Sequence, residues 1–220
     1  MRIKDPFNGI LLIMFKNFFR KRRLRKDGST IPTGFIPLDE IHSIAVVIDA
    51  SEPGYDTCIG CIRNYCSRHR MSLSVLFMDF RKFSSKVRMT TDRASTVTRR
   101  DLNWFGRPDL RKAYIVTGKP VDLFICLAND SSYCTEYLSK AAKARFKIGR
   151  NTFEGDPFNL IVAEPENGIQ QGQESPDGTT EIPVPASAGT EKRNVLKDAR
   201  PVPEKIFLAA ADLIEKIEHA

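Results

Sequence analysis

Residues 43–80, SIAVVIDASEPGYDTCIGCIRNYCSRHRMSLSVLFMDF, carry the pattern that decides the fold. The run at 43–50 is short, apolar and rich in β-branched residues, which is typical of a strand buried on both faces. A helix is predicted to follow from Asp56, whose carboxylate can cap it, to about Arg70. The run at 72–80 predicts a second strand. Because a helix separates them, we expect the two strands to lie parallel, joined by a right-handed crossover.

The alternation of strands and helices continues toward the C-terminus. The run VDLFICLA at 121–128 predicts a third strand, and Ser131 or Ser132 can cap the helix after it. Lys147 is expected on the outer side of that region. Further strands are predicted at 146–149 and 158–163, and a final helix at 203–218.

These elements predict a single three-layer Rossmann-like α/β domain with a mostly parallel sheet of about four to five strands, plus a basic N-terminal helix. Composition suggests four parts. They are a basic amphipathic segment and connector at 1–37, the α/β domain at 38–165, a disordered linker rich in Gly, Pro, Ser and Thr at 166–201, and a helix at 202–220 that packs back on the domain.

The positive charge of the chain is concentrated in one segment. The 220 residues include 34 Lys and Arg against 27 Asp and Glu, a formal charge of +7. Residues 16–26 hold seven basic residues and no acid, so the rest of the chain sums to zero. This distribution excludes a uniformly basic nucleic-acid coat, and the composition excludes collagen, a coiled coil and a polytopic membrane protein.

The segment at 16–26 follows a set of apolar residues at helical spacing. On a helix, Leu11, Phe15, Phe18 and Phe19 share one face. We expect the segment to bind an anionic surface, either a membrane or RNA, although a disordered basic tail that only keeps the protein soluble would have the same composition. The basic residues predicted to bind are Lys16, Arg20, Lys21, Arg22, Arg23, Arg25 and Lys26.

The N-terminal sequence and the cysteine content favour a cytoplasmic protein. The apolar run at 10–15 is too short to span a bilayer, and it leads into basic residues rather than a cleavage site. Five cysteines is an odd number, which favours reduced thiols. We therefore expect a cytoplasmic location at the inner face of the membrane, with Met14 as an alternative start to Met1.

Several acidic residues follow the predicted strands. Asp49, Asp79 and Asp130 would meet at the carboxyl edge of a parallel sheet, where they could hold Mg²⁺ or act as acid and base. Acids also end strands and cap helices in domains without activity. No dinucleotide fingerprint, phosphate loop or catalytic triad is present, so the sequence assigns no cofactor and no metal.

The cysteines after the first strand allow two further readings. Cys58 and Cys61 have the spacing of a thioredoxin-type redox pair at a helix start. Adding Cys66 and His69 gives four possible zinc ligands. We reject zinc if the helix is continuous, because positions 58 and 69 would then be separated by about 16 Å along its axis.

The stretch at 81–112 is predicted to be a long basic loop. It carries ten basic residues and three acids, and it contains the turn DLNWFGRP at 101–108 with the only tryptophan. Trp104 and Arg107 are candidate contacts for phosphate or RNA. The alternative interpretation is that the aromatic turn clips a long loop to the domain.

Three motifs resemble a small family of uncharacterised bacterial α/β proteins known only as a domain of unknown function. They are HSIAVVID at 42–49, DLNWFGRP, and VDLFICL with LSKAAKARFKIG between 121 and 149. The region 121–149 is also distantly similar to the acceptor-side domain of heptosyltransferase-like glycosyltransferases. Those enzymes bind the nucleotide sugar in a second domain that this chain has no room for, so the similarity implies the fold and not the activity.

The sequence therefore favours a non-catalytic cytoplasmic binding or scaffold protein tethered to a membrane or RNA by its basic segment, with a protein partner as a further option. The alternative hypothesis is an enzyme that acts on a phosphorylated or sugar substrate through strand-end carboxylates, with Mg²⁺ as its metal.

Overall fold

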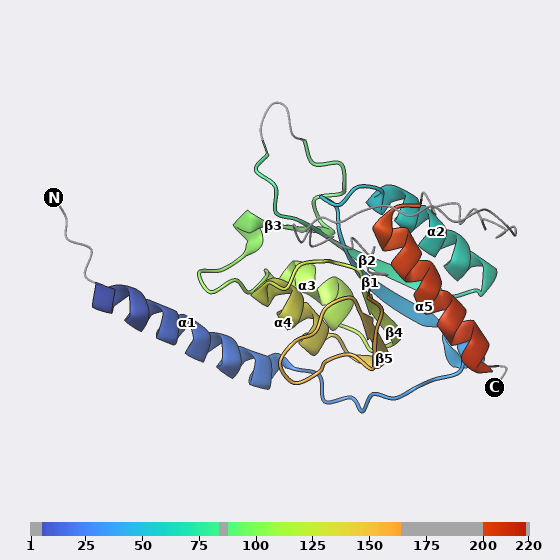
Figure 1. Cartoon of the computed structure of the whole chain (residues 1–220), viewed down its shortest axis with the longest axis horizontal. Helices are drawn as coiled ribbons and strands as arrows, with labels where there is room; N and C mark the ends of the chain where they lie inside the picture. The colour runs from blue at the N-terminus through green and yellow to red at the C-terminus, as the bar shows by residue number, and fades with distance from the viewer. Residues whose placement is uncertain (1–5, 84–87, 164–199, 219–220) are drawn as a thin grey trace, which may run out of the picture. The chain divides into compact units, whose positions relative to one another are not determined.

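The computed structural model describes residues 6–83, 88–163 and 200–218, and these form one parallel sheet in the order β3-β2-β1-β4-β5-β6 (Figure 1). The predicted α/β class is confirmed, and the strand count is slightly higher than expected. The strands are β1 (Ser43–Asp49), β2 (Ser72–Asp79), β3 (Thr96–Thr98), β4 (Val121–Cys126), β5 (Ala144–Gly149) and β6 (Leu160–Ile161).

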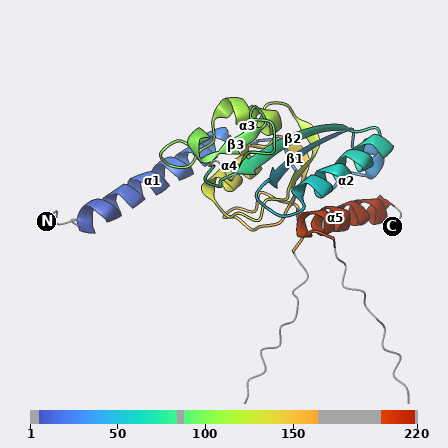
Figure 2. The same cartoon turned by 90° about the horizontal axis from the view of Figure 1, so that it is seen from above.

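Helices cover both faces of this sheet (Figures 1 and 2). The core on one face includes side chains of α2 and α5, and the core on the other includes side chains of α3 and α4. The helices are α1 (Pro6–Asp27), α2 (Tyr55–Arg68), α3 (Leu110–Thr117), α4 (Tyr133–Ala141) and α5 (Val202–Glu218), with short 3₁₀ turns η1 (Leu38–Glu40) and η2 (Arg99–Asp101).

The central strand β1 shows why both faces must be covered. Successive side chains of a strand point to opposite faces. Ile44, Val46 and Ile48 join the α2 and α5 core, whereas Ala45 and Val47 join the α3 and α4 core. All five are essentially inaccessible to solvent.

Two elements lie in the stretch at 81–112 that the sequence analysis treated as a loop. Strand β3 has only three residues, too few to show a period, and Val97 is its buried apolar side chain. Helix α3 is capped by Asp109, whose carboxylate accepts a hydrogen bond from the Arg111 amide. The cap and the helical spacing of Ala113 and Val116 were the signals that could have predicted α3.

The helix caps agree only in part with expectation. Ser132 caps α4 through a hydrogen bond from the Thr135 amide, as predicted. The prediction that Asp56 caps α2 is wrong, because α2 begins one residue earlier and its N-cap is Gly54. Gly54 has a φ of 78°, and a Cβ at this position would lie 2.2 Å from the Pro201 ring.

Lys147 is buried, contrary to the expectation that it faces solvent. It belongs to β5, and its ammonium group donates to the Ser139 carbonyl of α4 at 2.8 Å. Burial lowers the pKa of Lys147 to about 8. The error came from extending the helical pattern past residue 141, where the chain turns into β5.

An ion pair occupies the carboxyl edge beside β1 and β4, where the strand order reverses. A guanidinium nitrogen of Arg150 lies 2.8 Å from both carboxylate oxygens of Glu52 and 3.2 Å from the Leu127 carbonyl. The Arg150 side chain is only 3% exposed. This is the position at which open α/β sheets usually bind ligands, and here protein side chains fill it.

We predict that Glu52→Gln destabilises the fold by about 3 kcal/mol, because it removes the negative charge of a carboxylate whose two oxygens both accept from the buried Arg150 guanidinium. Urea unfolding at neutral pH measures the change. Arg145→Gln is the matched control, since it breaks an exposed pair with Glu40 and should change little. Equal losses for the two variants would contradict a special role for the buried pair.

Candidate anion-binding surfaces

The three carboxylates expected at the sheet edge each serve the turn that contains them. Asp49 accepts hydrogen bonds from the Ser51 amide at 2.7 Å and the Ser51 hydroxyl at 2.6 Å. Asp130 accepts from the Ser132 amide at 2.8 Å. Neither residue, nor Asp79, lines either of the two cavities described below.

Asp79 is fully buried and is bound by Arg81. The Arg81 guanidinium donates to both carboxylate oxygens, at 2.9 and 2.6 Å, and the Arg81 amide donates at 3.1 Å. Burial alone would raise the pKa of Asp79, but these hydrogen bonds and the positive charge outweigh it and the pKa is lowered. Asp79 is therefore an ionised support for Arg81, and as an acceptor its oxygens are already occupied.

The cysteines of α2 are placed as apolar core residues. Burial raises the pKa of Cys58 to about 12, whereas a redox-active cysteine needs a lowered pKa. Cys61 donates to Glu204 of α5 at 3.5 Å. Because α2 is continuous from 55 to 68 and His69 pairs with Glu215, the four possible zinc ligands do not converge.

The turn at 101–108 holds the C-terminal half of α1 against α4. Arg20 donates to the Phe105 carbonyl at 2.7 Å, and its guanidinium lies 4.8 Å from the centre of the Tyr133 ring. The Tyr133 hydroxyl donates in turn to the Arg20 carbonyl at 3.1 Å. Phe105, Tyr133 and their neighbours Tyr137 and Ala141 form a small core against which Leu24 packs.

A second set of contacts fixes the last turn of α1. The Tyr137 hydroxyl donates to Asp27 at 3.0 Å, and Arg107 pairs with the same carboxylate at 3.6 Å. Trp104 meets Phe19 edge to face, with ring centroids 5.6 Å apart. The turn therefore clips α1 to the domain. Two predicted binding residues, Trp104 and Arg107, take part in this docking, and the Arg107 side chain is only 19% exposed.

The turn owes its shape to two residues of its own sequence. The Asn103 side chain accepts hydrogen bonds from the Phe105 and Arg107 amides. Gly106 has a φ of 95°, which a residue with a side chain would adopt only with strain. The spacing of Asn103 and Gly106 orients Phe105 inward and leaves Trp104 exposed.

The apolar side chains described between residues 12 and 18 of α1 are exposed. Leu12, Ile13, Met14, Phe15 and Phe18 have between 52% and 64% of their surface accessible to solvent. Of the basic residues predicted to bind, Arg20 is engaged in docking and Lys21 pairs with Glu154. Arg22, Arg25 and Lys26 are exposed, and Lys16 and Arg23 are half-buried.

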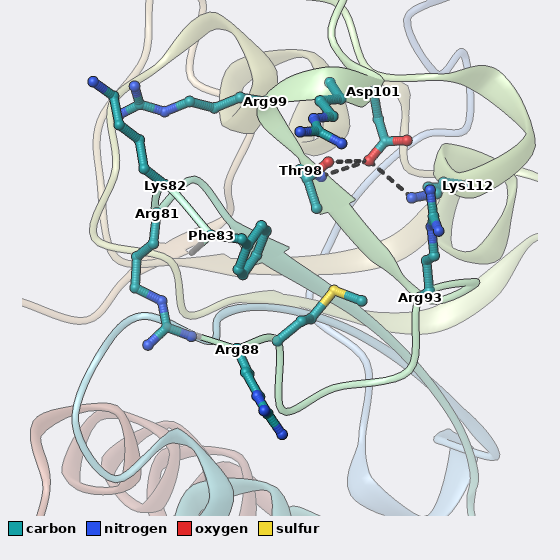
Figure 3. A pocket seen from close by; sticks show the side chains of 11 residues that line it. Arg81, Lys82, Phe83, Arg88, Arg93, Thr98, Arg99, Asp101 and Lys112 are labelled. Atoms are coloured by element: carbon teal, nitrogen blue, oxygen red, sulfur yellow. Dashed lines mark hydrogen bonds and ion pairs between the residues drawn. The ribbon is translucent and has the colours of Figure 1, made fainter. Parts of the chain in front are cut away.

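Described residues between Arg81 and Lys112 line a cationic cavity of about 620 Å³ (Figure 3). Two ion pairs order its wall. One is Asp79 with Arg81, and the other joins Asp101 to Lys112 at 2.8 Å. Asp101 also accepts from the amide and hydroxyl of Thr98 in a capping box. The basic residues that line the cavity are Arg81, Lys82, Arg88, Arg93, Arg99, Arg100 and Lys112.

A smaller cavity of about 260 Å³ lies on the other side of Asp101, lined by Asn103, Arg107 and residues 108–110. The sequence predicted the positive charge of this region but neither of the two cavities. The cavities depend on β3, η2 and α3, which bring Lys112 next to the Thr96 carbonyl of β3 and to Asp101.

We predict that the double change Tyr133→Phe and Tyr137→Phe loosens α1 without unfolding the domain. Each change removes one hydrogen bond to α1, worth about 1 kcal/mol, and keeps the packed ring. Amide hydrogen exchange of residues 20–27 should accelerate about tenfold or more. Tyr114→Phe, at an exposed position on α3, is the control. Unchanged exchange in the double variant would show that these hydrogen bonds do not hold α1.

Comparison with known proteins gives a family but no activity. Neither the curated proteins nor the solved structures yielded a significant match to the chain. A family model does match, over residues 16–175, which include the docked half of α1, the turn at 101–108 and all six strands. The chain therefore belongs to DUF6913, a family of unknown function.

Proposed function

We propose that the protein is a non-catalytic binding or scaffold module that α1 attaches to the surface of an anionic membrane. The observation that carries this proposal is the exposure of five apolar side chains on a helix that continues into exposed basic residues. Because the other half of α1 is fixed to the domain by the contacts of Arg20 and Asp27, attachment of α1 would also position the domain.

One face of α1 combines the two kinds of side chain. Phe15, Phe18, Arg22 and Arg25 are spaced at i, i+3, i+7 and i+10, so they lie along the same face of the helix. All four are exposed. Along this face the phenylalanines occupy one end, where they can insert into a membrane interface, and the arginines occupy the other, where they can meet anionic headgroups.

At an anionic bilayer, the apolar and the basic side chains of α1 both contribute to the free energy of binding. An apolar side chain of this size gains about 1.5 to 3 kcal/mol when it leaves water completely. Each Lys or Arg close to an anionic leaflet contributes about 1 kcal/mol. Several of each are exposed on α1, so the combined gain can exceed the cost of holding the protein at a surface.

The apolar residues favour a membrane over RNA. The phosphates of RNA would bind the arginines, but Leu12, Ile13 and Phe15 would remain in water. A lipid interface accommodates both groups. No helix in the described ranges is long and apolar enough to cross a bilayer, and attachment along the interface needs no such helix.

Two further observations support a location at the cytoplasmic face of a membrane and a non-catalytic role. All five cysteines are free thiols, as expected in a reducing compartment. The carboxylates that an enzyme would need, Asp49, Asp79 and Asp130, are engaged by hydrogen bonds within their own turns. The glycosyltransferase similarity expected for 121–149 is supported by no match among curated proteins or solved structures, and we propose no transferase activity.

We predict that the full-length protein sediments with vesicles that contain anionic lipid and much less with neutral vesicles. Phe15→Glu with Phe18→Glu should abolish sedimentation, because it places charge where side chains insert. Arg22→Gln with Arg25→Gln should weaken it about tenfold to thirtyfold, from the loss of about 2 kcal/mol. The fold should survive both changes, since all four side chains are exposed.

The control is Arg63→Gln with Arg68→Gln, which removes the same charge from an exposed part of α2. It should sediment like the unchanged protein. The proposal is overturned if the phenylalanine variant still sediments, if RNA binds in a way that depends on the arginines alone, or if Phe15→Glu with Phe18→Glu only dissolves a dimer.

A further inference from the structure

The cationic cavity lies at the edge of the sheet where α/β proteins bind ligands. Arg81 follows the last residue of β2 by two positions, and Thr98 is the last residue of β3. Both therefore stand at the carboxyl ends of parallel strands. The usual position, beside β1 and β4, is filled by the Arg150 and Glu52 pair, so the open hollow is displaced toward the β2 and β3 side.

Most of the positive charge of the cavity has no acidic partner among the described residues. Seven of its eleven lining residues are Arg or Lys, and Asp101 is the acid among them. Asp101 is already engaged, because its Oδ2 accepts from the amide and hydroxyl of Thr98 and from Lys112. In the described part of the chain, no ion pair involves Lys82, Arg88, Arg93, Arg99 or Arg100.

Part of this cationic wall is already ordered without a ligand. Arg81 is held by the buried Asp79, and the Lys112 ammonium donates to Asp101 at 2.8 Å and to the Thr96 carbonyl at 2.6 Å. The buried Asp79 fixes the position of Arg81, and the half-buried Asp101 fixes that of Lys112. An anion that binds here would therefore meet oriented donors and would lose less free energy to side-chain ordering.

The cavity also has the volume of a small-molecule site and contains an exposed aromatic ring. Its volume of about 620 Å³ lies in the range typical of small-molecule sites. Phe83 is 41% exposed, and the basic side chains stand around it (Figure 3). A base can stack on an exposed aromatic ring while its phosphates reach the surrounding cations.

We propose that this cavity binds a nucleoside polyphosphate, with the base against Phe83 and the phosphate chain between the η2 arginines and Lys112. Single phosphates would engage only a fraction of the seven cations, whereas a linked chain of phosphates can span several. The inference does not depend on membrane attachment, because no residue of α1 lines the cavity.

The test is isothermal titration calorimetry on the full chain with ATP, inorganic tripolyphosphate and adenosine. ATP should bind about tenfold more tightly than tripolyphosphate, from base stacking, and adenosine should not bind measurably. Arg99→Gln with Arg100→Gln should weaken both phosphate ligands about tenfold or more. Phe83→Ala should reduce the affinity for ATP to that for tripolyphosphate.

Two control variants distinguish binding at the cavity from an effect of net charge and from membrane attachment. Arg63→Gln with Arg68→Gln should bind ATP like the unchanged protein, and so should Phe15→Glu with Phe18→Glu. The inference is overturned if ATP does not bind, if Arg99→Gln with Arg100→Gln has no larger effect than the α2 control, or if tripolyphosphate equals ATP and Phe83→Ala changes neither. Binding of single-stranded RNA in place of ATP would also overturn it.

Discussion

The apolar character of β1 on both of its faces is the constraint on which the rest of the structure depends. Ile44, Val46 and Ile48 need one layer of helices, and Ala45 and Val47 need another. Two covered faces require crossover helices between parallel strands, and parallel strands place all their carboxyl ends at one edge. The strand-end acids Asp49 and Asp79 and the cationic cavity are located at that edge as a consequence.

What occupies the edge differs from one pair of strands to the next. Beside β1 and β4, Arg150 reaches back to Glu52 and closes the space with a buried ion pair. Beyond β2 and β3, the supporting acids Asp79 and Asp101 lie behind the bases they hold, and the hollow remains open. The same residue types therefore close one part of the edge and line a cavity in another.

The sequence predicted the elements whose signals are local and long enough. Apolar runs predict the strands at 43–49, 72–79 and 121–126, and helical periodicity predicts α2, α4 and α5. Strand β3 could not be predicted from its three residues, because it forms by pairing with β2. The burial of Lys147 was missed because the basic spacing continues the helical pattern past Ala141, whereas the chain turns there into β5 and brings Lys147 to the Ser139 carbonyl. The cavity could not be predicted either, since its basic residues come from the segment between β2 and β3, from η2 and from α3, and only the fold brings these three together.

The turn at 101–108 connects the two cationic regions that sequence analysis considered separately. At its start, Asp101 caps η2 and holds Lys112 at the cavity wall. Four residues later the Phe105 carbonyl accepts a hydrogen bond from Arg20, and Arg107 forms an ion pair with Asp27 at the end of α1. An antiparallel bridge between Leu102 and Pro108 closes the turn, so these contacts share one small rigid unit. A run of basic residues in the sequence shows only where positive charge is concentrated. The hydrogen bonds of this turn determine which basic side chains hold elements of the fold together and which remain free to bind an anion.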